Sequence, residues 1–130
     1  MIQGHRSMPI LSVEDVEKSV GFFTGGLGFS FAGSWQDDNG VPNFAIVVLD
    51  HITVGLQRVK QVKNLDTWAA YFYVEDIDAY AAQVTGSGVS LTSEIADKPH
   101  GCRELEITDP DGNVLCFGQD LSPSEDGPGL

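Results

Sequence analysis

Two similar segments, 61 residues apart, constrain the fold of this chain more than any other feature of its sequence. The first begins with Val-Glu-Asp-Val at 13–16 and reaches a glycine-rich stretch at 25–29. The second begins with Val-Glu-Asp-Ile at 74–77 and reaches Gly-Ser-Gly-Val at 86–89. An internal repeat of this kind predicts two copies of one structural unit, whose equivalent positions face each other inside the fold.

Each repeat predicts a strand, a helix and three further strands. Val16, Val20 and Phe23 recur at three- and four-residue spacing, which is typical of one apolar helix face, and Asp15 is a plausible N-cap. This helix ends at the glycines of 25–28, and the second helix covers 77–85. The predicted strands are 7–13, 29–35, 44–49, 52–57, 68–74, 88–93, 103–108 and 113–118.

The length of 130 residues is enough for one domain with a core of its own. We expect a single domain, 1–130, made of a first βαβββ module at 7–57, a linker at 58–67, a second module at 68–119 and a flexible tail at 120–130. The expected fold class is α+β, with the two modules forming a cupped mixed sheet and the helices on its convex side. The alternative is a plain two-layer ferredoxin-like sandwich without a cup.

The charge balance restricts the partners. Nineteen acidic residues stand against seven basic ones, for a net charge of −12. Nucleic acid is therefore not expected as a partner, whereas a cationic small molecule would be attracted. The same acidity also serves solubility. No membrane association is expected, because no apolar run approaches the roughly 20 residues that span a bilayer.

Two further features indicate a cytoplasmic protein. The segment from Met1 to Met8 lacks the apolar stretch of a secretory signal. The two cysteines, Cys102 and Cys116, are too few for a disulfide framework and suit a reducing compartment.

Several motifs resemble those of a known family. Met-Pro-Ile-Leu-Ser-Val-Glu-Asp at 8–15 and Leu-Gly-Phe at 27–29 are similar to the first module of the vicinal oxygen chelate superfamily. Asp-Pro-Asp-Gly-Asn at 109–113, with the Phe-Gly that follows at 117–118, resembles its metal-free bleomycin-resistance branch. The resemblance covers about residues 7–119 and implies paired βαβββ modules. It also implies a homodimer whose grooves are formed by both subunits.

The same resemblance locates four positions where metal-dependent members carry their ligands, one on the first and one on the fourth strand of each unit. These positions fall at Met8, Thr53, Ala69 and Cys116. A thioether, a neutral hydroxyl, a methyl group and one thiol do not suit a Lewis-acidic divalent ion. We therefore expect no metal, no other cofactor and no catalytic residue.

The alternation of side chains along the strands predicts what lines the cup instead. Tyr71 and Tyr73 face the cup, and Glu104 and Glu106 share one strand face, open either to a cationic ligand or to solvent. Arg103, beside Glu104, is expected to form a structural ion pair. The predicted ligand-binding residues are Trp35, Phe44, Thr53, Trp68, Tyr71, Tyr73, Glu104 and Cys116.

The leading functional prediction is metal-independent binding and sequestration of an aromatic, cationic small molecule, such as a bleomycin-type antibiotic, by stacking and charge complementarity. One alternative is a glyoxalase- or dioxygenase-like lyase or oxygenase on the same fold with an atypical active site. Another is a structural or regulatory module with a filled cavity. His100 and Cys102, on a predicted loop, lack the orienting third group that nucleophilic catalysis needs.

Overall fold

The computed structural model describes residues 1–122, and its strands form two four-stranded sheets, one in each repeat. Most of the predicted flexible tail, residues 123–130, lies outside the described residues. The first module comprises β1 (Ile10–Val13), α1 (Val16–Gly21), a π-helix η1 (Phe22–Gly26), β2 (Ser30–Gln36), β3 (Pro42–Leu49) and β4 (Ile52–Arg58). The second comprises β5 (Ala70–Tyr73), α2 (Ile77–Gly86), β6 (Ser93–Asp97), β7 (Cys102–Thr108) and β8 (Val114–Asp120).

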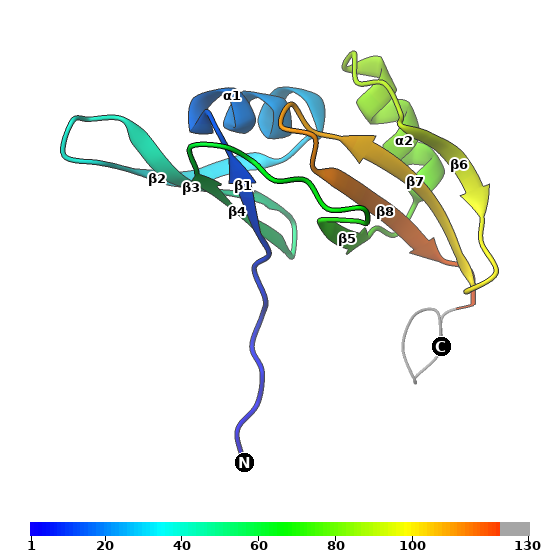
Figure 1. Ribbon diagram of the computed structural model, residues 1–130. Helices are drawn as coiled ribbons and strands as arrows, with labels where there is room; N and C mark the ends of the chain where they lie inside the picture. The colour runs from blue at the N-terminus through cyan, green and yellow to red at the C-terminus, as the bar shows by residue number, and fades with distance from the viewer. Residues whose placement is uncertain (123–130) are drawn as a thin grey trace.

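The two sheets have the same topology. Their strand orders are β1-β4-β3-β2 and β5-β8-β7-β6, and in each the first strand runs parallel to the fourth while the other pairs are antiparallel. Both helices lie on one side of the two sheets, which leaves the opposite faces uncovered (Figure 1). This arrangement confirms the predicted α+β fold of two βαβββ modules. None of the helices within residues 1–122 has the length and apolar character needed to cross a membrane.

Both α-helices begin directly after the aspartates of the repeated motif. The side chain of Asp15 accepts a hydrogen bond from the Lys18 amide at 3.1 Å, and that of Asp76 accepts one from the Ala79 amide at 3.0 Å. Each carboxylate satisfies one of the free N–H groups of a first helical turn, so both are N-caps. The repeated Glu-Asp pair is therefore a helix-start signal.

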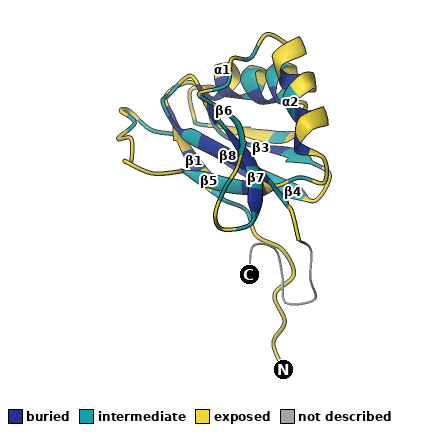
Figure 2. Ribbon diagram, turned by 90° about the vertical axis from the view of Figure 1, so that its right-hand side faces the viewer, coloured by how far each residue is buried: buried dark blue, intermediate teal, exposed yellow. Residues whose placement is uncertain are grey.

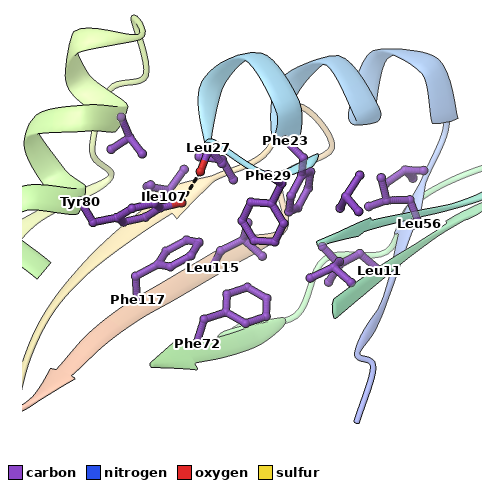
Figure 3. Packing of buried hydrophobic residues seen from close by; sticks show 14 of the residues in the cluster. Leu11, Phe23, Leu27, Phe29, Leu56, Phe72, Tyr80, Ile107, Leu115 and Phe117 are labelled. Atoms are coloured by element: carbon purple, nitrogen blue, oxygen red, sulfur yellow. Dashed lines mark hydrogen bonds between the residues drawn. The ribbon is translucent and has the colours of Figure 1, made fainter. Parts of the chain in front are cut away.

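The core lies between the helices and the sheets and is continuous across the two modules. The ring of Phe72, from β5, lies 5.1 Å from that of Phe117, on β8, and 6.4 Å from that of Phe29, which precedes β2 (Figure 3). The hydroxyl of Tyr80, on α2, donates to the Leu27 carbonyl at 2.7 Å. Aromatic packing and this buried hydrogen bond therefore hold the modules together. In Figure 2 the buried residues lie along the strands and on the inner sides of the helices.

The Asp-Pro-Asp-Gly-Asn turn also joins the modules. The side-chain amide of Asn113 donates to the Ser12 carbonyl at 2.9 Å, and the carboxylate of Asp111 accepts from the backbone amide of Glu14 at 3.0 Å. The other end of the turn is closed by Asp109, which accepts from the Asn113 backbone at 2.7 Å. This turn of the second module thus holds the end of β1 in the first.

The structure corrects two predicted elements. The predicted strand 88–93 is wrong, because the strand that follows α2 is β6, which covers Ser93–Asp97. Gly88, at φ +91°, ends the α2 segment, and the following residues pack on the core before the chain pairs with β7. The first predicted helix is divided, since α1 stops at Gly21 and continues as η1.

Ser19 provides a stability test of the α1 packing. Its hydroxyl is buried and has no hydrogen-bond partner within the described residues. Ser19→Ala removes an unsatisfied polar atom and adds a better helix former, so we expect stabilisation by about 1 kcal/mol. Urea unfolding of the variant and of Ser90→Ala, an exposed control, measures this. A loss of stability in Ser19→Ala alone would mean that the hydroxyl has a partner.

Candidate functional site

The uncovered face of the second sheet carries a row of three aromatic side chains, which we call the aromatic row: Trp68, Tyr71 and Tyr73. The rings of Trp68 and Tyr71 lie 5.1 Å apart, and those of Tyr71 and Tyr73 lie 4.9 Å apart. Tyr73 is half exposed, whereas Phe72, between the two tyrosines, points to the core on the other face. The alternation predicted for this strand therefore holds.

Two carboxylates lie beside the aromatic row on the same sheet face. Glu104, on β7, is 4% exposed, and its Oε2 accepts hydrogen bonds from the Tyr71 hydroxyl at 2.8 Å and from His100 Nε2 at 2.9 Å. Glu106 accepts a short hydrogen bond from the Trp68 indole N–H. Trp68 and Tyr71 thus direct their polar atoms to the two carboxylates, while the rings of the row stay on the uncovered face of the sheet.

The tyrosines of the row are held in their neutral form. Burial raises the pKa of Tyr71, and the neighbouring Cys102 and Glu104 raise it further. Burial also raises the pKa of Tyr73, with smaller contributions from Cys102, Asp120, Glu104 and Cys116. Both phenols therefore remain hydrogen-bond donors through the neutral and mildly alkaline range. Neither is placed to act as a phenolate base.

A glycine makes room for Tyr71. Gly118, on β8, is the cross-strand partner of Glu104 and of Tyr73. A methyl group at Gly118 would occupy the place of the Tyr71 hydroxyl, so only glycine lets this ring lie flat across β8 towards Glu104. The position of the acid–phenol pair therefore depends on a missing side chain.

Two cavities flank the aromatic row. The larger, about 600 Å³, lies between the modules and is lined by 7–9, 51–53 and 70–73, so it includes Thr53, Tyr71 and Tyr73. The smaller, about 200 Å³, is lined by Trp68, His100, Glu104 and Glu106 among others, and we call it the acidic recess. The first is mainly apolar and large enough for part of a flat organic molecule.

The first sheet carries a separate aromatic pair on its uncovered face. The rings of Trp35, on β2, and Phe44, on β3, lie 5.9 Å apart, and the Trp35 residue is 54% exposed. Phe44 lies over Gly55, where a methyl group would come within 2.9 Å of the ring. The predicted site residues thus form two groups, one on each sheet. That they contact a ligand stays a prediction.

The strand register corrects one of the four family metal positions. Ile10 pairs with Gly55 and Tyr71 pairs with Cys116, so Gly55, and not Thr53, corresponds to Cys116 in the repeat. The register of a distant strand cannot be read from alternation, which is unchanged by a shift of two residues.

The corrected set fits a metal ion no better. Met8 offers a thioether, Ala69 and Gly55 offer no donor, and Cys116 is buried with a pKa raised to about 12 by burial and then by nearby Glu104. In the part of the chain that the structure describes, no three His, Cys, Asp or Glu side chains come together as a metal site. These positions do not supply the nitrogen and oxygen ligands of a Lewis-acidic divalent ion.

The structure adds detail to the predictions for three residues on β7 and the turn before it. Arg103 forms the predicted structural ion pair, with Asp78 and Asp97 at 3.0 and 2.9 Å and not with the adjacent Glu104, because neighbouring strand residues point to opposite faces. Cys102 begins β7 and is buried, so it is not on a loop. The contact between His100 and Glu104 was not predicted. No local pattern of the sequence indicates this contact, because it depends on the turn between β6 and β7.

The buried cysteines lead to a labelling prediction. Because the pKa of Cys116 is raised to about 12, its thiolate is a minor species at pH 8, and Cys102 is 1% exposed. We expect neither thiol to react with Ellman's reagent in the native protein and both to react in denaturant. A thiol that reacts rapidly in the native state would contradict this burial and reopen the question of a nucleophile.

Comparison with known protein families gives a match over most of the chain. The family described as Glyoxalase/Bleomycin resistance protein/Dioxygenase superfamily matches residues 5–117. The chain belongs to this superfamily. None of the curated protein sequences matches it. Membership covers nearly all of both modules and agrees with the paired βαβββ topology.

Solved structures of the superfamily have the same fold. A glyoxalase-related enzyme from Clostridium phytofermentans is 26% identical, with a TM-score of 0.79, and the match covers 92% of this chain and 97% of that chain. The bleomycin-binding protein of Streptomyces verticillus, solved with copper(II)-bleomycin, is 23% identical, with a TM-score of 0.72 and coverages of 95% and 100%. An antibiotic-binding protein from Streptomyces sp. CB03234 is 21% identical, with a TM-score of 0.70 and coverages of 92% and 98%.

Proposed function

We propose that this chain is a metal-independent binding protein that sequesters an aromatic, cationic small molecule, such as a bleomycin-type antibiotic. The observation that carries the proposal is the aromatic row with two carboxylates on one uncovered sheet face. Aromatic faces stack on flat rings, and carboxylates beside them attract a cation. The net charge of −12 acts in the same direction at longer range.

Two further points support binding over catalysis. The four family metal positions do not supply an adequate ligand set. The Cys116 thiol stays protonated, and Cys102 is buried. Two similar folds belong to proteins described as bleomycin-binding and antibiotic-binding. The two unpaired cysteines suit a cytoplasmic location, which we include in the proposal.

We also propose a homodimer in which both subunits contribute to the groove. Ile10 and Trp35, on the uncovered face of the first sheet, are 56% and 54% exposed, and large exposed apolar side chains of this kind are favourable at interfaces. The acidic face of the second sheet would then be opposed by the apolar face of a partner's first sheet. Sedimentation analysis of the purified protein tests this: a strictly monomeric species would contradict it.

Tryptophan fluorescence tests the proposed function, because the two tryptophans lie one on each sheet. The probes are bleomycin and a panel of flat aromatic cations, each paired with a neutral compound of the same ring system. We expect saturable quenching by cations that is stronger than that by their neutral counterparts. Trp35→Phe and Trp68→Phe show which module responds. A flat titration with every probe would contradict the proposal and favour a filled cavity.

A further inference from the structure

The two hydrogen-bond partners of Glu104 in the acidic recess differ in how firmly they are held. The side chain of Glu104 is nearly buried and accepts a hydrogen bond from Tyr71, which is itself packed in the aromatic row. Its other partner, His100, is 47% exposed and lies on the turn between β6 and β7. Within residues 1–122, the hydrogen bond to Glu104 is the only one that the His100 side chain makes. His100 can therefore leave the carboxylate by breaking one hydrogen bond. Tyr71 cannot, because its ring is packed between Trp68 and Tyr73.

The turn that carries His100 is closed by backbone bonds that do not involve this side chain. Lys98 donates its amide to the Cys102 carbonyl at 2.8 Å, and Gly101 donates to the Lys98 carbonyl at 3.0 Å. Gly101 has φ +90°, which favours glycine at this point of the turn. Rotation of the His100 side chain, or its removal, therefore leaves the backbone of the recess in place.

The chemistry of the recess is that of a cation site. Glu104 and Glu106 supply two carboxylates, and Trp68 supplies an aromatic face beside them. Lys98 also lines the recess, but its single charge is outnumbered by the two acids. His100 presents a planar N–H group to the Glu104 carboxylate, which is the position and the kind of bond that an ammonium or amidinium group would take.

We propose that His100 occupies the position of the ligand's cationic group and is displaced when the ligand binds. The acidic recess then selects ligands that carry a protonated amine or amidine next to an aromatic ring. This inference rests on the proposed function and adds which group of the ligand is recognised and by which residues. Tyr71 orients the Glu104 carboxylate, and the ligand's N–H groups replace the His100 N–H on the same carboxylate. Trp68 packs against the ring that carries the cation.

Benzylammonium, an aromatic ring with one protonated amine, is the probe that tests this inference. All titrations use the Trp35→Phe background, so that Trp68, in the recess, is the single tryptophan reporter. Removal of the competing side chain by His100→Ala should tighten benzylammonium binding about tenfold, since a hydrogen bond to a charged group no longer has to be broken. H100Q, which keeps an N–H donor for Glu104, should bind benzylammonium nearly as weakly as the Trp35→Phe protein without a change at His100.

Two controls separate recognition of charge from a simple gain of space. The double variant His100→Ala with Glu104→Gln should lose the gain, and benzyl alcohol, a neutral probe of similar shape, should bind H100A and the parent equally. The inference is overturned if H100A binds benzylammonium no more tightly than the parent, if neither binds it, or if benzyl alcohol gains as much. The proposed function is judged separately, on the parent protein with the ligand panel, so the two can fail independently.

Discussion

Replacing Glu104 with glutamine is expected to weaken binding of a cationic aromatic ligand by roughly 30-fold or more, because a nearly buried carboxylate loses its charge in the site. Glutamine keeps an oxygen that can accept from Tyr71, so the side chain remains in place. Neutral aromatic probes should bind the variant as they bind the parent. Titration of both kinds of probe, followed by tryptophan fluorescence, measures the difference.

The matched control is Glu17→Gln, which removes the same charge from the exposed first turn of α1, on the helix side of the sheet. Any general effect of net charge on a cationic ligand appears in both variants, and only the local effect appears in Glu104→Gln. Equal losses in the two variants would mean that long-range attraction, and not the recess, determines affinity.

Replacing Phe72 with alanine is expected to destabilise the protein by roughly 3–5 kcal/mol, because the ring packs between Phe29 of the first module and Phe117 of the second. The cavity left behind would lie where the two modules meet. The measurement is the free energy of unfolding from urea titrations. The transition should remain single if the modules unfold together.

Tyr73→Ala is the matched control for this variant, since it removes an aromatic ring from the next residue on the opposite face of β5. Tyr73 is 50% exposed, so the stability should change by less than about 1 kcal/mol. Ligand affinity should fall more in Tyr73→Ala than in Phe72→Ala, because Tyr73 belongs to the proposed binding surface. A large stability loss in Tyr73→Ala would mean that the aromatic row is part of the core and not a binding surface.

The sequence pattern was sufficient to predict which side chains of β5 and β7 share a sheet face. Tyr71 and Tyr73 separate from Phe72, and Glu104 separates from Leu105, because the period of two along a strand is a local property. The repeat also predicted both helix starts, since an aspartate N-cap acts within one turn.

What could not be predicted depends on contacts between distant residues. Gly55 replaced Thr53 as the equivalent of Cys116 because strand register is decided by pairing, not by the pattern along one strand. Strand β6 was displaced from the predicted 88–93 for the same reason. The hydrogen bond from His100 to Glu104 depends on the turn at Lys98–Gly101. The periodicity of side chains along a strand does not determine the conformation of such a turn.

The central claim is that this face binds an aromatic cation without a metal ion. It is tested most directly by calorimetric titration of chelator-treated protein with the tightest aromatic cation of the panel that has no metal-chelating groups, with and without added divalent metal. We expect the same affinity and stoichiometry in both titrations. Binding that appears only when a stoichiometric metal ion is bound to the protein would contradict it.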